Sequence, residues 1–299
     1  MGQGWRLGLF ITMVGSLISG CTTPTRTHSD TPAPAAWMDW RQRRHESAAG
    51  VDGWTTIVGL YWLSEGRHTV GPHANDSIRV GPSGPVGEFV RAGTNVWFHP
   101  APGHSVTVGD AQIERPVQLI ADVPGPATKL TQGDYQLWLL KRGDRWAIRV
   151  RDRSAPARRH FHGLTYFPWQ ADWVIESHFD AHPPGTTLLI TDVTGATKLE
   201  PNPGSLIFRY AGGEYRLEVL ADDETRDLFI LFRDDTNGNT TYSPGRFLHA
   251  PLPDDSGRVL LDFNRAYNPP CAFTDSATCP RPPAANRLPF PVSAGEKKY

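Results

Sequence analysis

Glycine and proline recur along the whole chain, with 29 glycines and 27 prolines in 299 residues. Proline interrupts helices, and both residues are concentrated in turns. This composition argues against a helical bundle and favours many short strands joined by turns. The 10 Trp, 13 Phe and 8 Tyr residues can fill the core of such a fold. The sequence therefore predicts a mainly β protein whose body is similar to a β-sandwich or a barrel.

The first 20 residues have the pattern of an export signal. Arg6 precedes an apolar run over residues 7–18, which is too short to cross a hydrocarbon core of about 30 Å. The run leads into the letters LISGC, which end at Cys21 and resemble the bacterial lipobox. We therefore expect residues 1–20 to be a signal peptide and Cys21 to carry lipid chains that hold the protein to a membrane. An ordinary secretory signal with a chance cysteine is the alternative.

Charge and location limit the partners that the chain is expected to have. Without residues 1–20, the chain has 29 basic and 31 acidic side chains and no basic run, which argues against binding to nucleic acid. Thr22 follows the lipobox in place of Asp, which by the usual sorting rule indicates the outer membrane. The expected partners are the membrane, through the lipid, and either a small polar ligand or another protein of the cell envelope.

The pattern of the chain predicts four parts. They are a signal peptide over 1–20, the lipidated cysteine with a flexible, proline-bearing tether over 21–36, a helix and β subdomain over 37–117, and a β region with a proline-rich tail over 118–299. The predicted helix covers residues 37–49, where Trp37, Trp40 and Arg44 fall on one face at helical spacing.

Residues 63–80 resemble the opening of a forkhead-associated β-sandwich. Such domains use an arginine directly after a glycine to bind a phosphate, whereas here Pro72 follows Gly71. The resemblance therefore implies the architecture of the N-terminal β part and not the recognition of a phosphopeptide.

The short motifs of the common enzyme classes are missing from the sequence. It contains no GxSxG, no HExxH, no P-loop and no Rossmann glycine pattern in a βαβ context. His160 and His162 alternate and could meet His178 at a metal, but surface histidines next to Arg158 and Arg159 explain them better. The sequence predicts no metal site and identifies no cofactor.

The first polar segment of interest follows an apolar run at 228–232, which has the pattern of a buried strand. The letters RDDTNGNTTY continue from Arg233, and Asn-Gly within them is a strong hairpin turn signal. Asp235, Asn237 and Asn239 could alternatively supply oxygen ligands to calcium, although the loop lacks the later Glu of an EF-hand. A turn within a hairpin and a ligand site both remain open.

The second polar segment contains two cysteines and the letters LDFNRAYNPPC over residues 261–271. Asp262 and Asn264 share a face if this segment is a strand. Cys271 and Cys279 can form a disulfide in an oxidising compartment, while free thiols and a metal site are the alternatives. A proline-rich C-terminal wrap pinned by this disulfide is the plain structural interpretation.

Several motifs resemble the bacterial and archaeal domain of unknown function 1684 family, over about residues 37–299. They are GLYWL at 59–63, RVRD at 149–152, FRDDTNGNTTYSPGR at 232–246, LDFNRAYNPPC at 261–271 and AGEK at 294–297. The resemblance implies no reaction, because the family has no activity to carry over. Its members with and without export signals imply that a disulfide is not the only role of the two cysteines.

The leading functional hypothesis is one polar pocket, used for ligand binding or hydrolysis, that gathers the residues of these motifs. The candidate catalytic residues are Asp234, Asp262 and Glu296, with one pKa raised by the charge of a neighbour. The candidate ligand-binding residues are Arg151, Asp152, Thr236, Tyr242, Arg246, Asn264, Tyr267 and Asn268. Arg246 is expected to hold an anionic group. The alternative is a non-catalytic structural or interaction module of the envelope.

Overall fold

The computed structural model describes residues 1–2, 32–123, 125–221 and 226–299. The chain divides into two units, Met1–Asp30 and Thr31–Tyr299. All the described helices and strands belong to the second unit. Cys21 and nearly all of the predicted signal peptide lie outside the described residues. In the described part of the chain, no helix is long and apolar enough to cross a membrane.

Helix α1 spans Ala35–Ala49, in agreement with the predicted helix over 37–49. It begins after Pro34, whose fixed φ suits a helix start, and ends at Gly50. The Trp37 side chain is buried, and its indole Nε1 donates to the Asn264 carbonyl at 2.9 Å. One face of the helix therefore packs against a segment more than 200 residues later in the chain.

The N-terminal strands form two sheets around a shared apolar core. A six-stranded sheet has the order β1 (Ile57–Leu63), β11 (Arg145–Asp152), β10 (Tyr135–Arg142), β9 (Lys129–Gln132), β6 (Thr107–Val108), β7 (Ala111–Gln112). A five-stranded sheet has the order β3 (Ile78–Arg79), β2 (Gly66–Gly71), β4 (Gly87–Ala92), β5 (Asn95–Pro100), β8 (Val117–Gln118). Because side chains alternate along a strand, Trp146, Ile148 and Val150 of β11 all face the core.

Strand pairing shows that this N-terminal β part extends past the predicted boundary after residue 117. Strand β11 pairs with β1 from Ile57↔Arg151 to Leu63↔Trp146, and its buried residues share one core with Phe89 and Phe98. Residues 129–152 therefore complete the N-terminal sheets and do not begin the second β region. A strand can pair with a partner far away in sequence, and the turn signals in the sequence do not specify that partner.

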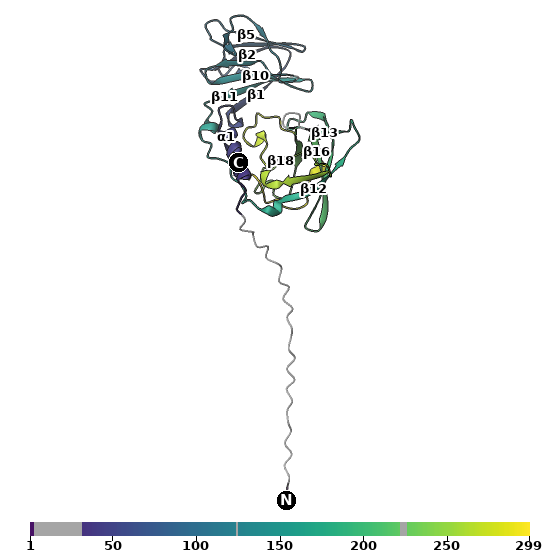
Figure 1. The fold of residues 1–299 in the computed structure, drawn as a ribbon. Helices are drawn as coiled ribbons and strands as arrows, with labels where there is room; N and C mark the ends of the chain where they lie inside the picture. The colour runs from purple at the N-terminus through teal and green to yellow at the C-terminus, as the bar shows by residue number, and fades with distance from the viewer. Residues whose placement is uncertain (3–31, 124, 222–225) are drawn as a thin grey trace. The chain divides into compact units, whose positions relative to one another are not determined.

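The C-terminal part is a curved six-stranded sheet, a half-barrel, together with a separate hairpin (Figure 1). The sheet has the order β18 (Arg246–Ala250), β17 (Leu228–Phe232), β16 (Gly213–Ala221), β15 (Gly204–Tyr210), β12 (Val174–Ala181), β19 (Arg258–Asp262), and the hairpin consists of β13 (Thr187–Thr191) and β14 (Thr197–Pro201). A short helix α2 (Pro156–Arg159) precedes the sheet. The prediction of a mainly β protein with a short N-terminal helix is confirmed.

Strands β17 and β18 are apolar on both faces because each face meets a different core. Leu228, Ile230 and Phe232 belong to one cluster, which also contains Leu248 and Ala250. The alternate residues, Phe229 and Leu231 of β17 and Phe247 of β18, belong to a second cluster with Ile190, Leu220 and Cys279. The second cluster lies beside the pocket described below.

After β19 the chain forms no further strand and wraps along the half-barrel as turns and short 3-10 helices. The 3-10 helices are η3 (Phe263–Arg265), η4 (Pro270–Ala272) and η5 (Ala284–Asn286). Isolated bridges tie the wrap to earlier segments at Phe247↔Tyr267, Arg233↔Arg287 and Tyr166↔Glu296. The tail therefore has the wrapped form of the structural interpretation, and side-chain contacts hold it in place.

Candidate functional site

Asp234 follows directly after β17 and is the centre of a buried hydrogen-bond network. Its Oδ1 accepts from the Thr236 backbone N–H at 2.8 Å, from the Thr236 hydroxyl at 2.5 Å and from the Val292 N–H at 3.1 Å. Its Oδ2 accepts from Arg246 Nη2 at 2.8 Å, and both side chains have 0% exposure. The carboxylate is paired and out of reach of solvent, an arrangement typical of a buried structural ion pair.

Arg246 at the start of β18 holds the C-terminal tail as well as Asp234. Its Nη2 donates to the Val292 carbonyl at 2.9 Å, and its Nη1 donates to the Ala294 carbonyl. Burial lowers the pKa of Arg246, while the charge of Asp234 and the hydrogen bond to it act in the opposite direction. The anionic partner of Arg246 in the structure is therefore Asp234.

The turn after Asp234 is closed by its own side chains. Asn237 donates through Nδ2 to the Thr241 hydroxyl at 2.9 Å and to the Tyr242 carbonyl at 3.0 Å. Gly238 adopts φ 87°, the left-handed conformation that an Asn-Gly turn requires. Strands β17 and β18 pair as antiparallel partners on either side of this loop, as the hairpin interpretation expects.

Asp262 and Asn264 fix the first turn of the wrap. Asp262 Oδ1 accepts from the Asn264 backbone N–H at 3.1 Å and from its Nδ2 at 2.9 Å. The Asn264 side chain also exchanges two hydrogen bonds with the backbone of Gln170, at 2.9 and 3.0 Å. This pair is a cap for η3 and a tie to an earlier loop, and it lies in a different network from Asp234.

Glu296 forms a third network with helix α1 and has 0% exposure. Its Oε1 pairs with Arg44 Nε at 2.8 Å and its Oε2 with Arg44 Nη2 at 3.2 Å. The Asn268 N–H donates to Oε2 at 2.8 Å, and the Tyr166 hydroxyl lies 3.4 Å from Oε1. Burial and the charge of Glu296 raise the pKa of Tyr166. Glu296 is thus a clamp between α1 and the tail.

The remaining predicted site residues are spread over other surroundings. Arg151 of β11 binds Asp52 at 2.9 Å and Gln136 at 3.1 Å, while Asp152 Oδ1 accepts from the N–H and the hydroxyl of Ser154. Both belong to the N-terminal sheet, and neither touches the networks of the tail. The two ends of the predicted constellation are therefore separate in the structure.

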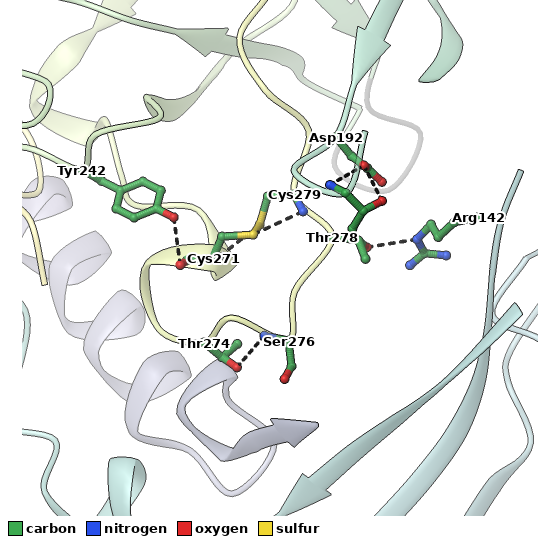
Figure 2. The surroundings of a disulfide bond; sticks show 9 residues. Arg142, Asp192, Tyr242, Cys271, Thr274, Ser276, Thr278 and Cys279 are labelled. Carbon is green, nitrogen blue, oxygen red and sulfur yellow. Dashed lines mark hydrogen bonds between the residues drawn. A yellow bond between two sulfur atoms is a disulfide. The ribbon is translucent and has the colours of Figure 1, made fainter. Parts of the chain in front are cut away.

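Cys271 and Cys279 lie at disulfide distance, with their Cα atoms 6.1 Å apart (Figure 2). The Tyr242 hydroxyl donates to the Cys271 carbonyl at 2.9 Å, and burial raises the pKa of that tyrosine. Within the loop that the cysteines close, Thr274 donates to the Ile57 carbonyl at 2.9 Å. Thr278 accepts from Arg142 Nε at 3.1 Å. The loop therefore connects the half-barrel to strands β1 and β10.

A pocket of about 470 Å³ lies beside the second apolar cluster of the half-barrel. Its walls come from α1, the hairpin, strands β16 to β18 and the wrap. The lining residues are Arg44, Trp54, Ile190, Glu200, Leu220, Ala221, Phe229, Phe247, His249, Tyr267, Asn268, Pro270, Phe273 and Pro280. Of the predicted ligand-binding residues, Tyr267 and Asn268 line this pocket. Its size lies in the range of small-molecule sites, and its lining combines aromatic and aliphatic side chains with polar ones.

Three polar side chains that line the pocket, Arg44, His249 and Tyr267, meet in one corner. The Tyr267 hydroxyl lies 2.8 Å from His249 Nε2, and the two rings are parallel with centroids 5.8 Å apart. The Arg44 guanidinium lies over the Tyr267 ring, with Cζ 4.6 Å from the centroid. On the other side of His249, the Phe229 ring stacks at 4.9 Å. This corner presents a guanidinium, an imidazole and a phenol beside an apolar wall.

Sequence reasoning identified Tyr267 and Asn268 but did not assign Arg44, His249 or the aromatic wall to the site. Arg44 had one signal, its place on the same helical face as the two tryptophans. His249 is the cross-strand partner of Phe229. That pairing follows from the register of β17 and β18, which motif matching does not supply.

Within residues 1–2, 32–123, 125–221 and 226–299, no group of three or more His, Cys, Asp or Glu side chains could hold a metal ion. His178 lies on β12, where its ring is close to Gly257, and His160 follows α2.

Comparisons with known proteins relate the chain to uncharacterised ones. The model of a family described as "Protein of unknown function (DUF1684)" matches residues 159–297, and no curated protein matches the chain. Among the solved structures that match is the solution NMR structure of an uncharacterised protein from Haloarcula marismortui. It is 34% identical, covering 47% of this chain and 79% of that chain, with a TM-score of 0.40. Through residues 159–297, which contain the Asp234, Asp262 and Glu296 networks, the chain belongs to the DUF1684 family.

Proposed function

We propose that this protein is a small-ligand-binding protein of the cell envelope, held to a membrane by lipid on Cys21. The observation that carries the binding proposal is the pocket of about 470 Å³ with its polar corner of Arg44, His249 and Tyr267. The lipobox-like letters before Cys21 support the anchor. The buried carboxylates make binding a better proposal than hydrolysis.

The construction of the pocket supports a role in binding. Phe229, Phe247 and His249 project from paired strands, whose register fixes the positions of these side chains. Arg44 is fixed by Glu296, so the polar corner is organised before any ligand arrives. A preorganised site loses less conformational entropy on binding than a flexible one.

A bulky side chain at the rim of the pocket is expected to weaken binding of a neutral apolar probe. Ala221 ends β16, is exposed and lines the pocket, so Ala221→Trp adds an indole ring at its rim. We expect the Cys21→Ala chain to bind one equivalent of N-phenyl-1-naphthylamine, measured by fluorescence titration. The added Ala221→Trp change should weaken this binding by about 10-fold or more, which corresponds to a loss of about 1.4 kcal/mol of binding free energy.

The matched control for this change is Ala181→Trp. Ala181 is exposed at the end of β12 and does not line the pocket, so its replacement should leave the titration unchanged. Equal affinity in all three proteins would place the probe elsewhere and contradict the proposed site. A wild-type pocket that binds no neutral apolar probe would argue against a ligand-binding role altogether.

Removal of the lipid attachment residue is expected to release the protein from membranes. Cys21→Ala eliminates the thiol that would carry the acyl chains, which contribute about 0.8 kcal/mol per buried CH₂. The variant should move to the soluble fraction of the envelope. Immunoblotting of fractionated cells measures this change. The variant with Cys271→Ser and Cys279→Ser keeps Cys21 and should stay with the membranes. Membrane retention of Cys21→Ala would contradict the anchor.

An interaction module of the envelope is the second candidate, and one feature of the hairpin favours it. Leu189 of β13 and Leu199 of β14 are cross-strand partners, and they are 58% and 62% exposed. Two large apolar side chains side by side on a surface can contribute to a protein–protein contact. Together with the buried networks of Asp234 and Glu296, this feature suits a protein whose polar motifs stabilise the fold while the hairpin binds a partner.

A further inference from the structure

We infer that the ligand of the pocket is a small carboxylate, in which an anionic head binds at Arg44 and an apolar body lies against the aromatic wall. This inference rests on the proposed function, because it names the class of molecule that the same pocket would bind. It is argued from the position of Arg44, from the charges that line the pocket and from the chemistry of the apolar wall.

Arg44 has one guanidinium arm left for a ligand. Nε and Nη2 bind the Glu296 carboxylate, and Nη2 also lies 3.4 Å from the Asn268 carbonyl. Within the part of the chain that the structure describes, Nη1 makes no hydrogen bond, and 21% of the side chain is exposed. Because Glu296 and the Tyr267 ring hold the guanidinium plane, the free arm has a fixed direction, as recognition of a carboxylate requires.

The charge of Glu296 does not remove the attraction of this corner for an anion. Glu296 is fully buried and also accepts from the Asn268 N–H and contacts Tyr166, so its negative charge is shared among several donors. It does not line the pocket, whereas Arg44 does. A ligand in the pocket therefore meets the cationic member of the pair, and its carboxylate would complete the unfilled donor.

Among the described lining residues, Glu200 is the one carboxylate, and it is engaged elsewhere. It lies on β14, and Lys198 Nζ binds it at 2.9 Å. A cationic head group would have to compete with that lysine for Glu200. It would also have to approach the Arg44 guanidinium, which carries a positive charge and presents donors only. The arrangement therefore favours an anionic head over an ammonium.

The apolar wall beside the polar corner selects an apolar body. Phe229 and Phe247 contact each other edge to face, with centroids 5.0 Å apart. Ile190, Leu220 and Phe273 extend this wall along the pocket. Such a surface offers no hydrogen bonds to a sugar or a phosphate ester, and it gains free energy by burying hydrocarbon. A head with one negative charge on a ring or a short alkyl chain matches both sides of the site.

The test compares three probes that share a ring and differ in the head: 2-naphthoate, 2-naphthamide and 2-naphthylmethylamine. Their affinities for the Cys21→Ala chain are measured by isothermal titration calorimetry at pH 7. We expect naphthoate to bind at least about 10-fold more tightly than the amide, the gain that a charge-assisted hydrogen bond gives, and the amine to bind most weakly. Octanoate against octanamide repeats the comparison with an aliphatic body.

Two variants locate the head group. Arg44→Gln combined with Glu296→Gln removes both charges of the pair, so no buried charge is left alone, and the preference for naphthoate should fall to within about threefold of unity. Arg44→Lys keeps the cation but loses the planar fork, and it should reduce the preference even if the double variant does not fold. Arg67→Gln with Glu88→Gln removes an ion pair of the N-terminal sheet and should leave all affinities unchanged.

Each outcome separates this inference from the proposed function. Equal binding of the amide and the carboxylate, or tightest binding of the amine, would overturn the carboxylate while the pocket remains a ligand site. An unchanged preference for naphthoate in Arg44→Lys and in the folded double variant would also overturn it, because the anion would then bind elsewhere. If the protein bound none of these probes and did not bind N-phenyl-1-naphthylamine either, the result would count against both the inference and the proposed function.

Discussion

Replacement of Arg246 by methionine is expected to lower the free energy of unfolding by about 3–5 kcal/mol. Asp234 and Arg246 form an ion pair in which both side chains have 0% exposure. Without the guanidinium, the Asp234 carboxylate stays buried with no cation beside it. The carbonyls of Val292 and Ala294 also lose their donors, so the end of the tail is released. Urea denaturation followed by tryptophan fluorescence measures the change.

Two matched variants distinguish a buried charge from a general loss of packing. The double variant Asp234→Asn with Arg246→Met removes both charges, while the amide oxygen can still accept from Thr236 and Val292. It should therefore be more stable than Arg246→Met alone. Arg67→Met breaks a pair that is 71% exposed on the arginine side and should change stability by less than about 1 kcal/mol. If Arg246→Met alone were as stable as the double variant, the buried-charge argument would be refuted.

The same pair shows where sequence reasoning reached its limit. The residue types of the signature indicated a polar constellation, and the structure does bury Asp234, Arg246, Asn264 and Glu296 among polar partners. Several of the partners, however, are backbone groups of distant segments, such as the Ala294 carbonyl for Arg246. A sequence shows which side chains can donate or accept, but the identity of a backbone partner depends on how the tail wraps. The structural alternative therefore explains these side chains better than a shared pocket does.

The architecture could be predicted from the sequence better than the site, for a physical reason. Short apolar runs such as 228–232, bounded by turn residues, specify a strand locally, and the helix from Ala35 carries its own start and stop. The pocket depends instead on long-range register: Phe229 meets His249 across a pair of strands, and Arg44 meets Tyr267 across more than 200 residues. Neither of these two contacts follows from the spacing of residues within one motif.

Gly295→Ala is expected to destabilise the protein by about 3 kcal/mol or more, the sum of left-handed strain and overpacking. Gly295 adopts φ 76°, in the region that disfavours a side chain. An added Cβ would lie 2.9 Å from the Ala266 Cβ and 2.9 Å from the Phe263 carbonyl oxygen, and would also meet the Ala266 carbonyl oxygen. Two of these neighbours are backbone atoms that cannot rotate away, so the tail itself must move.

The consequences of that movement extend to the pocket, because Gly295 lies between two anchors of the tail. Ala294 binds Arg246, and Glu296 orients Arg44. Displacement of Glu296 should therefore weaken binding of 2-naphthoate more than binding of 2-naphthamide, even where enough folded protein remains to titrate. Gly103→Ala is the matched control: its φ is 81°, but no atom lies within 4 Å of the added Cβ, so only about 1–2 kcal/mol of conformational strain is expected. Equal destabilisation of the two variants would show that close packing around Gly295 contributes nothing, whereas a larger loss at Gly295 together with a reduced carboxylate preference would connect the fold of the tail to the site.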